Sequence, residues 1–397
     1  MEIRQIRLEE RAAYEKLSAR CFTYPYKEEP EAWAMEAAAM RQYRGAFDEN
    51  GRLCSAMIQL DYGCHFGGQE TKLLGIGGVV SDPALRRNGG IRALFEEGLP
   101  RARREGYTFS ALYPFSHVFY RKFGYELAQV SREAVLEPQA LRDDLRGAAE
   151  ISLVLPEDAE GRTAVRQVYE DYARERNLSL HRDDALWERK WKGATLEQMK
   201  YLYFLRDAAG TPMAYWLGEV ETLPGGMKGL HLTDMAWRTA EGLEAIFAML
   251  RGSNEFVKVR LLAPADVELR YFLKEPYQLE EKTFCNGMAR VLDVRRALAM
   301  MPAPALPGKC VLRVQDAQIA ENCGAFRITG DDRELLVEDA EAEAADIETD
   351  IGGLTLLVLG SMDIAQFAMQ RRGAVRRVTP FMQLLFTRRG TFLHDAF

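Results

Sequence analysis

The sequence predicts an α+β protein in which two similar mixed-sheet domains precede a smaller third domain. Its 397 residues exceed the size at which one hydrophobic core keeps growing, so several domains are expected. A series of strand-like and helix-like segments begins at the first residues and restarts near residue 151. A further α+β region follows, with a Pro-rich linker at 302–308. We therefore predict domains at 1–150, 151–287 and 288–397.

The composition is typical of a soluble globular protein. Hydrophobic residues make up 47% of the chain and charged residues 28%, which is enough for an ample core. No stretch approaches the ~20 apolar residues that cross a bilayer, and the first residues lack the apolar core of a secretory signal. We expect a cytoplasmic protein that binds no membrane. The net charge of -7 argues against nucleic-acid binding and suits a cationic substrate.

The cysteines and histidines predict no metal site. The six cysteines form no Cys-x-x-Cys pair and have no histidine at the spacing of metal ligands. The five histidines show no repeated spacing, and histidines so scattered are more often structural than catalytic. We expect most of the cysteines to be buried thiols; they are Cys21, Cys54, Cys64, Cys285, Cys310 and Cys323.

The elements of the first domain are predicted from the period of the apolar residues and from turn residues. In order, we expect a strand at 2–8, helices at 9–22 and 33–40, two strands within 43–63 around a hairpin turn at 48–51, a strand at 72–81, an amphipathic helix ending near 106, a strand at 108–115 and a turn-rich segment at 116–128.

The second and third domains are predicted in the same way. The second repeats the order of the first, but its connection from strand to helix lacks paired arginines and glycines. We expect strands at 151–156, 201–207, 213–220 and 230–237 and helices at 161–177 and 239–252, then strands at 309–314, 325–330 and 334–339 and a helix at 362–372.

The loop that follows the strand at 72–81 is suited to bind an anion. It contains Arg86 and Arg87, and the glycines Gly89 and Gly90 stand directly before the next helix. Backbone N–H groups at a helix N-terminus are unpaired, and glycines let a pyrophosphate approach the main chain closely. A glycine pair also occurs in ordinary basic loops. The strand at 72–81, which directly precedes this loop, can however offer its N–H and C=O groups to the amides of a pantetheine arm.

Residues 86–91 match in part the pattern Gln/Arg-x-x-Gly-x-Gly/Ala, and this segment resembles the coenzyme A loop of GCN5-related N-acetyltransferases (GNAT proteins). Ile91 stands where that pattern has a small residue. With Phe-Tyr-Arg-Lys-Phe-Gly-Tyr at 119–125 and an aromatic last residue, the whole chain resembles the enhanced-intracellular-survival (Eis-type) branch. The resemblance implies two tandem GNAT-like domains, the second without the phosphate cradle, and a sterol-carrier-protein-like domain. It also implies transfer of acetyl from acetyl-CoA to an amine.

The resemblance assigns three short segments to acetyl-CoA. The end of the strand pairs with pantetheine, the loop holds the pyrophosphate, and a pair of residues after the strand at 108–115 makes a further contact. Family members often carry Ser-Glu at that pair. The residues implied are Val79, Val80 and Ser81, then Arg87, Asn88, Gly89, Gly90, Ile91 and Arg92, and finally Phe115 and Ser116.

The resemblance also implies a general acid and a general base. Tyr120, which precedes Arg-x-Phe-Gly, matches the acid, because a phenol can protonate the leaving thiolate. Tyr125 is the alternative. The family's base is the C-terminal carboxylate, here that of Phe397, which follows an apolar run that favours burial. An α-carboxyl with a pKa of about 3.5 is a weak base unless burial raises the pKa or water relays the proton. Asp395 and His394 are second choices.

The acceptor pocket is weakly defined by the sequence. Tyr24, Tyr26, Glu28 and Trp33 follow the first helix, where this superfamily builds acceptor-binding walls, although aromatic residues there more often serve packing. Glu28 or Asp395 can pair with a cationic acceptor, either an aminoglycoside-like sugar or a lysine side chain. A lipid-binding protein and a non-catalytic coenzyme A scaffold are the alternative functions. The family implies a homohexamer.

Overall fold

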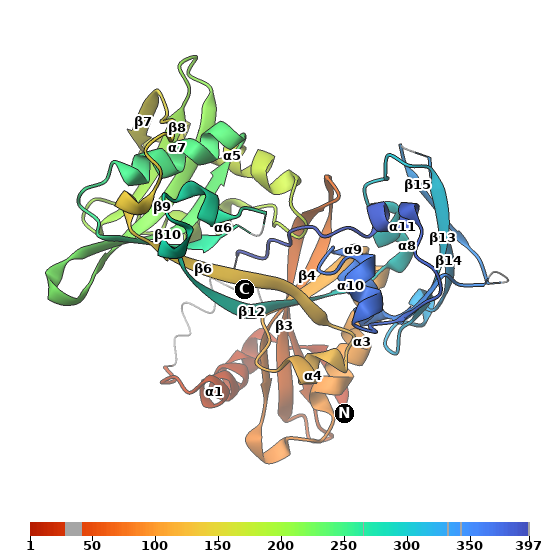
Figure 1. Ribbon diagram of the computed structural model, residues 1–397. Coiled ribbons are helices and arrows are strands. Elements are labelled where there is room, and N and C mark those ends of the chain that lie inside the picture. The colour runs from red at the N-terminus through yellow and green to blue at the C-terminus, as the bar shows by residue number, and fades with distance from the viewer. Residues whose placement is uncertain (28–41, 265, 332, 342–343, 396–397) are drawn as a thin grey trace. The chain divides into compact units, whose positions relative to one another are not determined.

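The computed structural model describes residues 1–27, 42–264, 266–331, 333–341 and 344–395 (Figure 1). Tertiary contacts divide the chain into two units, and each is described by itself. Unit 1 contains residues 1–129, 287–389 and 393–397, whereas unit 2 contains residues 130–286 and 390–392. Two of the crossings between the units fall within strands, β6 (Glu126–Leu136) and β12 (Glu280–Val291), and the others lie on either side of residues 390–392.

The first sheet of unit 1 changes from antiparallel to parallel pairing at its centre. β1 pairs with β2, β2 with β3 and β3 with β4, all antiparallel, whereas β4 and β5 run parallel. The end of β12 completes the sheet by pairing antiparallel with β5, from Met288 opposite Leu112 to Val291 opposite Phe109. The strands are β1 (Glu2–Gln5), β2 (Tyr43–Phe47), β3 (Leu53–Phe66), β4 (Gln69–Ser81) and β5 (Tyr107–Leu112).

Among the described residues, three helices accompany this sheet: α1 (Arg11–Phe22), α3 (Gly90–Arg104) and α4 (His117–Arg121). α3 buries Leu94, Phe95 and Leu99 against β2, β3 and β4. The predicted order of strand, basic glycine loop and amphipathic helix is confirmed.

Two predicted elements near this loop differ from the structure. The strand predicted at 108–115 ends at Leu112, just before Pro114, which has no N–H for a strand ladder. The segment at 116–128 contains the helix α4, because the Ser116 hydroxyl accepts a hydrogen bond from the Phe119 N–H (3.3 Å) and caps it. The helix predicted at 33–40 lies outside the described residues.

Unit 1 also contains a five-stranded sheet from the C-terminal region. Its strand order is β15-β14-β13-β16-β17, with β13 and β16 parallel. The helix α9 was not predicted, because all of its residues are buried and it has no polar face. Among the described helices, none is long and apolar enough to cross a membrane. The elements are α8 (Val294–Ala299), β13 (Gly308–Gln315), β14 (Gly324–Gly330), β15 (Leu335–Asp339), β16 (Ile347–Asp350), α9 (Ile351–Val358), α10 (Ile364–Met369), β17 (Ala374–Val375) and α11 (Pro380–Leu385).

The strands of unit 2 follow the order β6-β11-β10-β9-β8-β7, which corresponds to the strand order of the first sheet of unit 1. β9 and β10 are antiparallel, a helix follows β10, and β11 runs parallel to β10. The elements are β7 (Glu150–Leu153), α5 (Ala159–Arg174), α6 (Asp184–Trp191), β8 (Lys200–Arg206), β9 (Pro212–Thr222), β10 (Lys228–Trp237), α7 (Ala240–Arg251) and β11 (Lys258–Ala263).

Each half of the chain supplies the last strand of the other half's sheet. β6 follows α4 in sequence but pairs with β11 of unit 2, where Leu136 lies opposite Val259. β12 follows β11 in sequence but pairs with β5 of unit 1. The contact-based units therefore cut the chain inside strands. The predicted domain boundaries at 150 and 287 stay a prediction.

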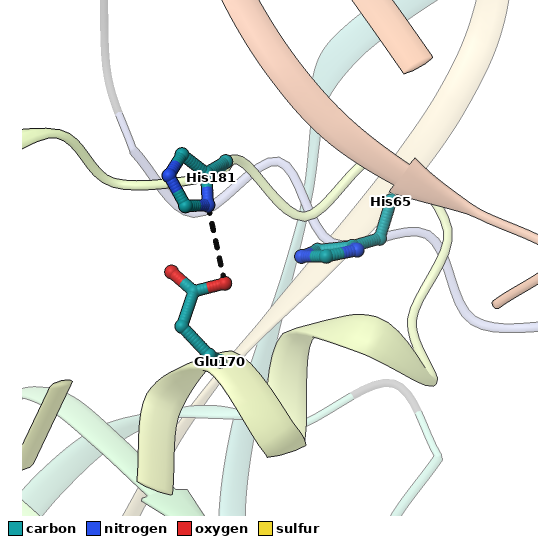
Figure 2. A group of neighbouring side chains, drawn as sticks. All are labelled: His65, Glu170 and His181. Atoms are coloured by element: carbon teal, nitrogen blue, oxygen red, sulfur yellow. Dashed lines mark hydrogen bonds and ion pairs between the residues drawn. The ribbon is translucent and has the colours of Figure 1, made fainter. Parts of the chain in front are cut away.

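A surface ion pair in unit 2 joins α5 to the loop before α6. His181 Nδ1 lies 3.3 Å from Glu170 Oε2 (Figure 2). The pair is charged only when His181 is protonated. Because His181 is largely exposed, the pair contributes little to stability. His65, also drawn in Figure 2, belongs to β3 of unit 1. The predicted absence of a metal site stays a prediction.

A buried ion pair stands at the centre of unit 2. Arg182 donates to both carboxylate oxygens of Asp234 (2.6 and 3.1 Å), and the Tyr215 hydroxyl donates to the same group (2.8 Å). Burial alone would raise the pKa of Asp234, but the charges of Arg182 and Lys190 hold it well below its ordinary value. The resulting stability is present above about pH 4, the ordinary Asp pKa, and is lost as the pH falls through the lower folded-state pKa.

We expect Arg182→Ala to lower the free energy of unfolding by about 3–5 kcal/mol, because the Asp234 carboxylate stays buried without its main partner. Denaturant titration followed by circular dichroism measures this change. Arg206 is the matched control, since its guanidinium donates to the Gly210 carbonyl at the surface (3.1 Å). Its replacement by Ala should change stability by about 0.5 kcal/mol or less. Equal effects of the two substitutions would contradict the assignment.

Candidate functional site

A groove of about 1140 Å³ opens in unit 1 along the end of β4, the following loop and the start of α3. Ten of the residues that the sequence analysis assigned to acetyl-CoA line it. They are Val79, Val80, Ser81, Arg87, Asn88, Gly89, Gly90, Ile91, Arg92 and Phe115.

One wall of the groove is the free edge of β4. β4 and β5 pair from Lys72 and Tyr107 only as far as Ile76 and Leu112, although β4 continues to Ser81. On its other side, the end of β4 still pairs with β3. Within the described chain, the N–H and C=O groups of 77–81 that face away from β3 therefore have no strand partner. Such an edge can accept an extended ligand that carries amides.

The register of β4 shifts where the two strands separate. A bulge relative to β3 falls after Gly77, and the next residue, Gly78, has φ +53°. A Cβ atom at Gly78 would lie 2.6 Å from the Tyr14 hydroxyl, so a larger residue would be both strained and crowded. Bulges of this kind bend the strand that carries them, and this one falls where the pairing of β4 with β5 ends.

The loop from Asp82 to Gly89 is fastened at its first residue. The buried Asp82 carboxylate accepts hydrogen bonds from the Ala84 N–H (3.0 Å) and from Arg52 (2.6 Å). The Ala84 hydrogen bond, which outweighs burial, and the charges of Arg52 and Arg20 hold the pKa of Asp82 below its ordinary value. The carboxylate therefore stays ionised and keeps the loop in position.

The loop ends at an uncapped helix N-terminus. Gly89 is the N-cap of α3 with φ +81°, and no side chain caps the helix there. The first N–H groups of a helix have no partner within it, so they are available to an anion. A Cβ atom at Gly90 would lie 2.5 Å from Ser55 Oγ, which shows how closely the helix start packs on β3.

The charges around the groove favour an anionic ligand. Four basic side chains and one acidic side chain line it. The arginines of the loop are exposed, so they can rotate toward phosphate oxygens. The residues are Arg86, Arg87, Arg92 and Lys122, with Glu96 as the carboxylate.

Tyr120 lies on α4 next to two aromatic rings that line the groove. Its ring packs edge-on against Phe115 and Phe119, with centroids 5.4 and 5.1 Å apart. Its side chain is 3% exposed. Burial, and to a lesser degree the neighbouring Tyr125, raise the pKa of Tyr120, so the phenol keeps its proton well above neutral pH. The residues that the structure describes offer its hydroxyl no hydrogen bond. The catalytic role of Tyr120 stays a prediction.

Tyr125, the alternative acid, is committed to the core. Its hydroxyl lies 2.6 Å from Ser110 Oγ, and the Ser110 hydroxyl donates to the Leu74 carbonyl (2.8 Å). Tyr125 must therefore be the donor to Ser110. Burial raises its pKa to about 12. Its proton is used in the hydrogen-bond chain that links the residue before β6 to β5 and β4, which favours Tyr120 as the acid.

Phe115 and Ser116 have different surroundings. Phe115 is 72% exposed and lines the groove. The Ser116 hydroxyl caps α4 and is not a lining residue within the described structure. A contact between Ser116 and a ligand stays a prediction.

The C-terminal segment is anchored next to the end of β5. The Tyr113 hydroxyl donates to the carbonyl oxygens of Leu393 (2.8 Å) and Asp395 (3.2 Å), and the Leu393 N–H donates to Gln129 Oε1. Burial and the Asp395 charge raise the pKa of Tyr113, so it remains a donor. Asp395 is buried. Phe397, the predicted base, lies outside the described residues, as do Glu28 and Trp33.

Six of the lining residues that the sequence analysis did not assign to acetyl-CoA lie outside the segment 79–96. Five come from segments already considered, namely the end of α1 and the α4 region. The sixth, Gln318, comes from the loop after β13, and no pattern in the sequence connects that loop to the first domain. The residues are Cys21, Phe22, Phe119, Lys122, Phe123 and Gln318.

Family models match three segments of the chain. Residues 2–128 and 178–291 each match an acetyltransferase (GNAT) domain, and residues 294–387 match a sterol carrier protein domain. The predicted fold, two tandem GNAT-like domains followed by a sterol-carrier-protein-like domain, is thereby confirmed. No curated protein sequence matches the chain.

Solved structures with the same fold cover the full length. A GCN5-related N-acetyltransferase from Anabaena variabilis is 20% identical, with a TM-score of 0.84 and 100% of both chains covered. Eis1 from Mycobacterium abscessus is 19% identical, with a TM-score of 0.83 and again 100% of both chains. A GCN5-related N-acetyltransferase from Kribbella flavida is 18% identical, with a TM-score of 0.79, and covers 100% of this chain and 98% of its own.

Proposed function

Because the chain belongs to the GCN5-related N-acetyltransferase superfamily of acyltransferases, with the Eis-type order of domains, we propose that it transfers acetyl from acetyl-CoA to a primary amine. One observation carries the proposal. A single groove joins an open strand edge to an uncapped helix N-terminus with arginines around it. An amide-bearing arm and a diphosphate are the two parts of coenzyme A that such a groove fits.

The donor is placed by three segments. Val79, Val80 and Ser81 pair with the pantetheine amides, and the main chain from Arg87 to Arg92 holds the pyrophosphate. Phe115 covers the arm from the opposite side. The thioester then lies toward α4, where Tyr120 packs edge-on against the Phe115 and Phe119 rings that line the groove.

The reaction is a direct attack within a ternary complex. The amine nitrogen bonds to the thioester carbonyl carbon, and the C–S bond breaks as the tetrahedral intermediate collapses. The thiolate takes the phenolic proton of Tyr120, which burial keeps on the oxygen at neutral pH. The protonated acceptor first gives one proton to the terminal carboxylate of Phe397, directly or through water, so that its neutral nitrogen can attack; the second proton of that nitrogen restores the Tyr120 phenol. The anchoring of Leu393 and Asp395 by Tyr113 supports this assignment.

The acceptor is a cationic amine, either an aminoglycoside-like sugar or a lysine side chain. The overall charge of -7 and the acidic candidates Glu28 and Asp395 suit it, with Trp33 as a wall. A cytoplasmic location, expected from the composition, and a homohexamer, implied by the family, belong to the same proposal.

The function is tested by thiol release from acetyl-CoA with a panel of aminoglycosides, polyamines and lysine peptides. We expect release above the hydrolysis background with at least one class. A lipid-binding protein or a non-catalytic scaffold would release nothing with any of them, and that result would refute the proposal.

We expect Gly89→Glu to weaken acetyl-CoA binding at least a hundredfold in calorimetry, because it places a carboxylate at the helix N-terminus that faces the diphosphate. Gly51→Glu is the matched control. Gly51 also has a positive φ (+75°) with open space around it, but it lies in the hairpin turn before β3. Unchanged affinity of Gly89→Glu would mean that the diphosphate binds elsewhere.

We expect Tyr120→Phe, and separately deletion of Phe397, to lower kcat by about 10²-fold or more while acetyl-CoA affinity stays within about twofold. The substitution removes the phenolic proton, and the deletion moves the terminal carboxylate back by one residue. Tyr125→Phe should leave kcat nearly unchanged. Steady-state kinetics and calorimetry measure both quantities. A larger loss in Tyr125→Phe than in Tyr120→Phe would reverse the assignment of the acid.

A further inference from the structure

The short helix that carries Tyr120 is fastened to the sterol-carrier-like domain by a buried carboxylate. Glu126, at the start of β6, is 4% exposed. It accepts hydrogen bonds from Arg121 at the end of α4 (2.7 and 3.0 Å) and from Arg372 (2.7 Å). Although burial opposes ionisation, Arg121, the Leu127 N–H and Arg372 leave the pKa of Glu126 below its ordinary value. The network therefore stays charged across the neutral range.

Arg372 is a fixed point of that domain rather than a free surface group. Its N–H donates to the Phe367 carbonyl (3.2 Å), and its carbonyl accepts from the Thr349 hydroxyl (3.2 Å). The guanidinium thus reaches Glu126 from a backbone that β16 and α10 hold.

A second network holds the turn that follows α4. Arg290 donates to the Phe123 carbonyl and, at 2.6 Å, to Asp316 of the sterol-carrier-like domain. Both side chains are 0% exposed, and Asn322 donates to the same carboxylate (2.9 Å). Gly124, which follows Phe123, has φ +79°, and a Cβ atom there would lie 2.5 Å from Ile351 at the start of α9. The turn therefore packs against this domain without space for a side chain.

These contacts matter because α4 has only five residues and cannot hold its own position. A helix of that length is unstable in isolation, and its hydrogen bonds cannot fix where Tyr120 points. The described residues give the Tyr120 hydroxyl no hydrogen bond, so its direction depends on ring packing and on the placement of α4. A misplacement of about 1 Å at a catalytic group can cost about 10²-fold in rate.

We propose that the sterol-carrier-like domain is a positioning element of the transferase, in which Arg372 and Asp316, acting through Glu126 and Arg290, set the place of the acid Tyr120. This inference rests on the proposed function, because it assumes that Tyr120 acts as the acid. It gives the third domain a role in catalysis that requires no lipid ligand.

Arg372→Ala tests the positioning role. We expect kcat to fall at least tenfold, acetyl-CoA affinity in calorimetry to stay within about twofold, and hydrogen–deuterium exchange of the backbone amides at 117–123 to become at least tenfold faster. Arg372→Lys should recover part of each loss. Arg376→Ala is the matched control, because Arg376 pairs with Glu348 (3.4 Å) in the same domain and makes no contact with α4 among the described residues. All three quantities should be unchanged in it.

A double substitution separates positioning from general damage. In a Tyr120→Phe background, Arg372→Ala should lower kcat by no more than about twofold, since the group whose position it sets is gone. The same tenfold loss in that background, or unchanged exchange at 117–123, would overturn the inference. Exchange is measured without substrate. It therefore tests the network even if no amine is acetylated, a result that would count against the proposed function instead.

Discussion

The arrangement of the site depends on the point at which β4 and β5 stop pairing. Parallel pairing ends at Ile76 and Leu112, while β4 continues to Ser81. Backbone groups left open in a protein interior are costly, so such an edge persists only where a ligand or water completes it. The bulge at Gly78, the anchored Asp82 and the uncapped start of α3 all follow within fourteen residues of this point. The groove is thus a product of main-chain geometry more than of particular side chains.

This origin explains why the loop was predictable from sequence. Glycines before an amphipathic helix and arginines beside them are local signals, and the structure brings those residues to one groove. The predicted strand extended three residues beyond the observed end of β5 at Leu112. The helix α4 was missed, because a short helix depends on its cap at Ser116 and on tertiary contacts, which have no period in the sequence. α9 was missed because a helix buried on every side has no amphipathic pattern.

The contacts of the third domain were beyond the reach of sequence. Arg290 and Asp316 stand 26 positions apart, and Glu126 and Arg372 are 246 positions apart. Neither pair belongs to a motif, and an arginine in a strand is ordinarily expected at the surface. Only the fold shows that Arg290 is completely buried. The same applies to Gln318, whose loop meets the groove through folding of the third domain on the first.

The exchange of β6 and β12 between the two halves has a consequence for synthesis on the ribosome. Until β12 emerges, β5 is an open edge strand, and roughly 160 further residues must be translated after residue 129, which takes roughly 10–30 s. An exposed edge of this kind invites pairing between nascent chains. A fragment that ends before β12 would leave this edge of β5 without its strand partner.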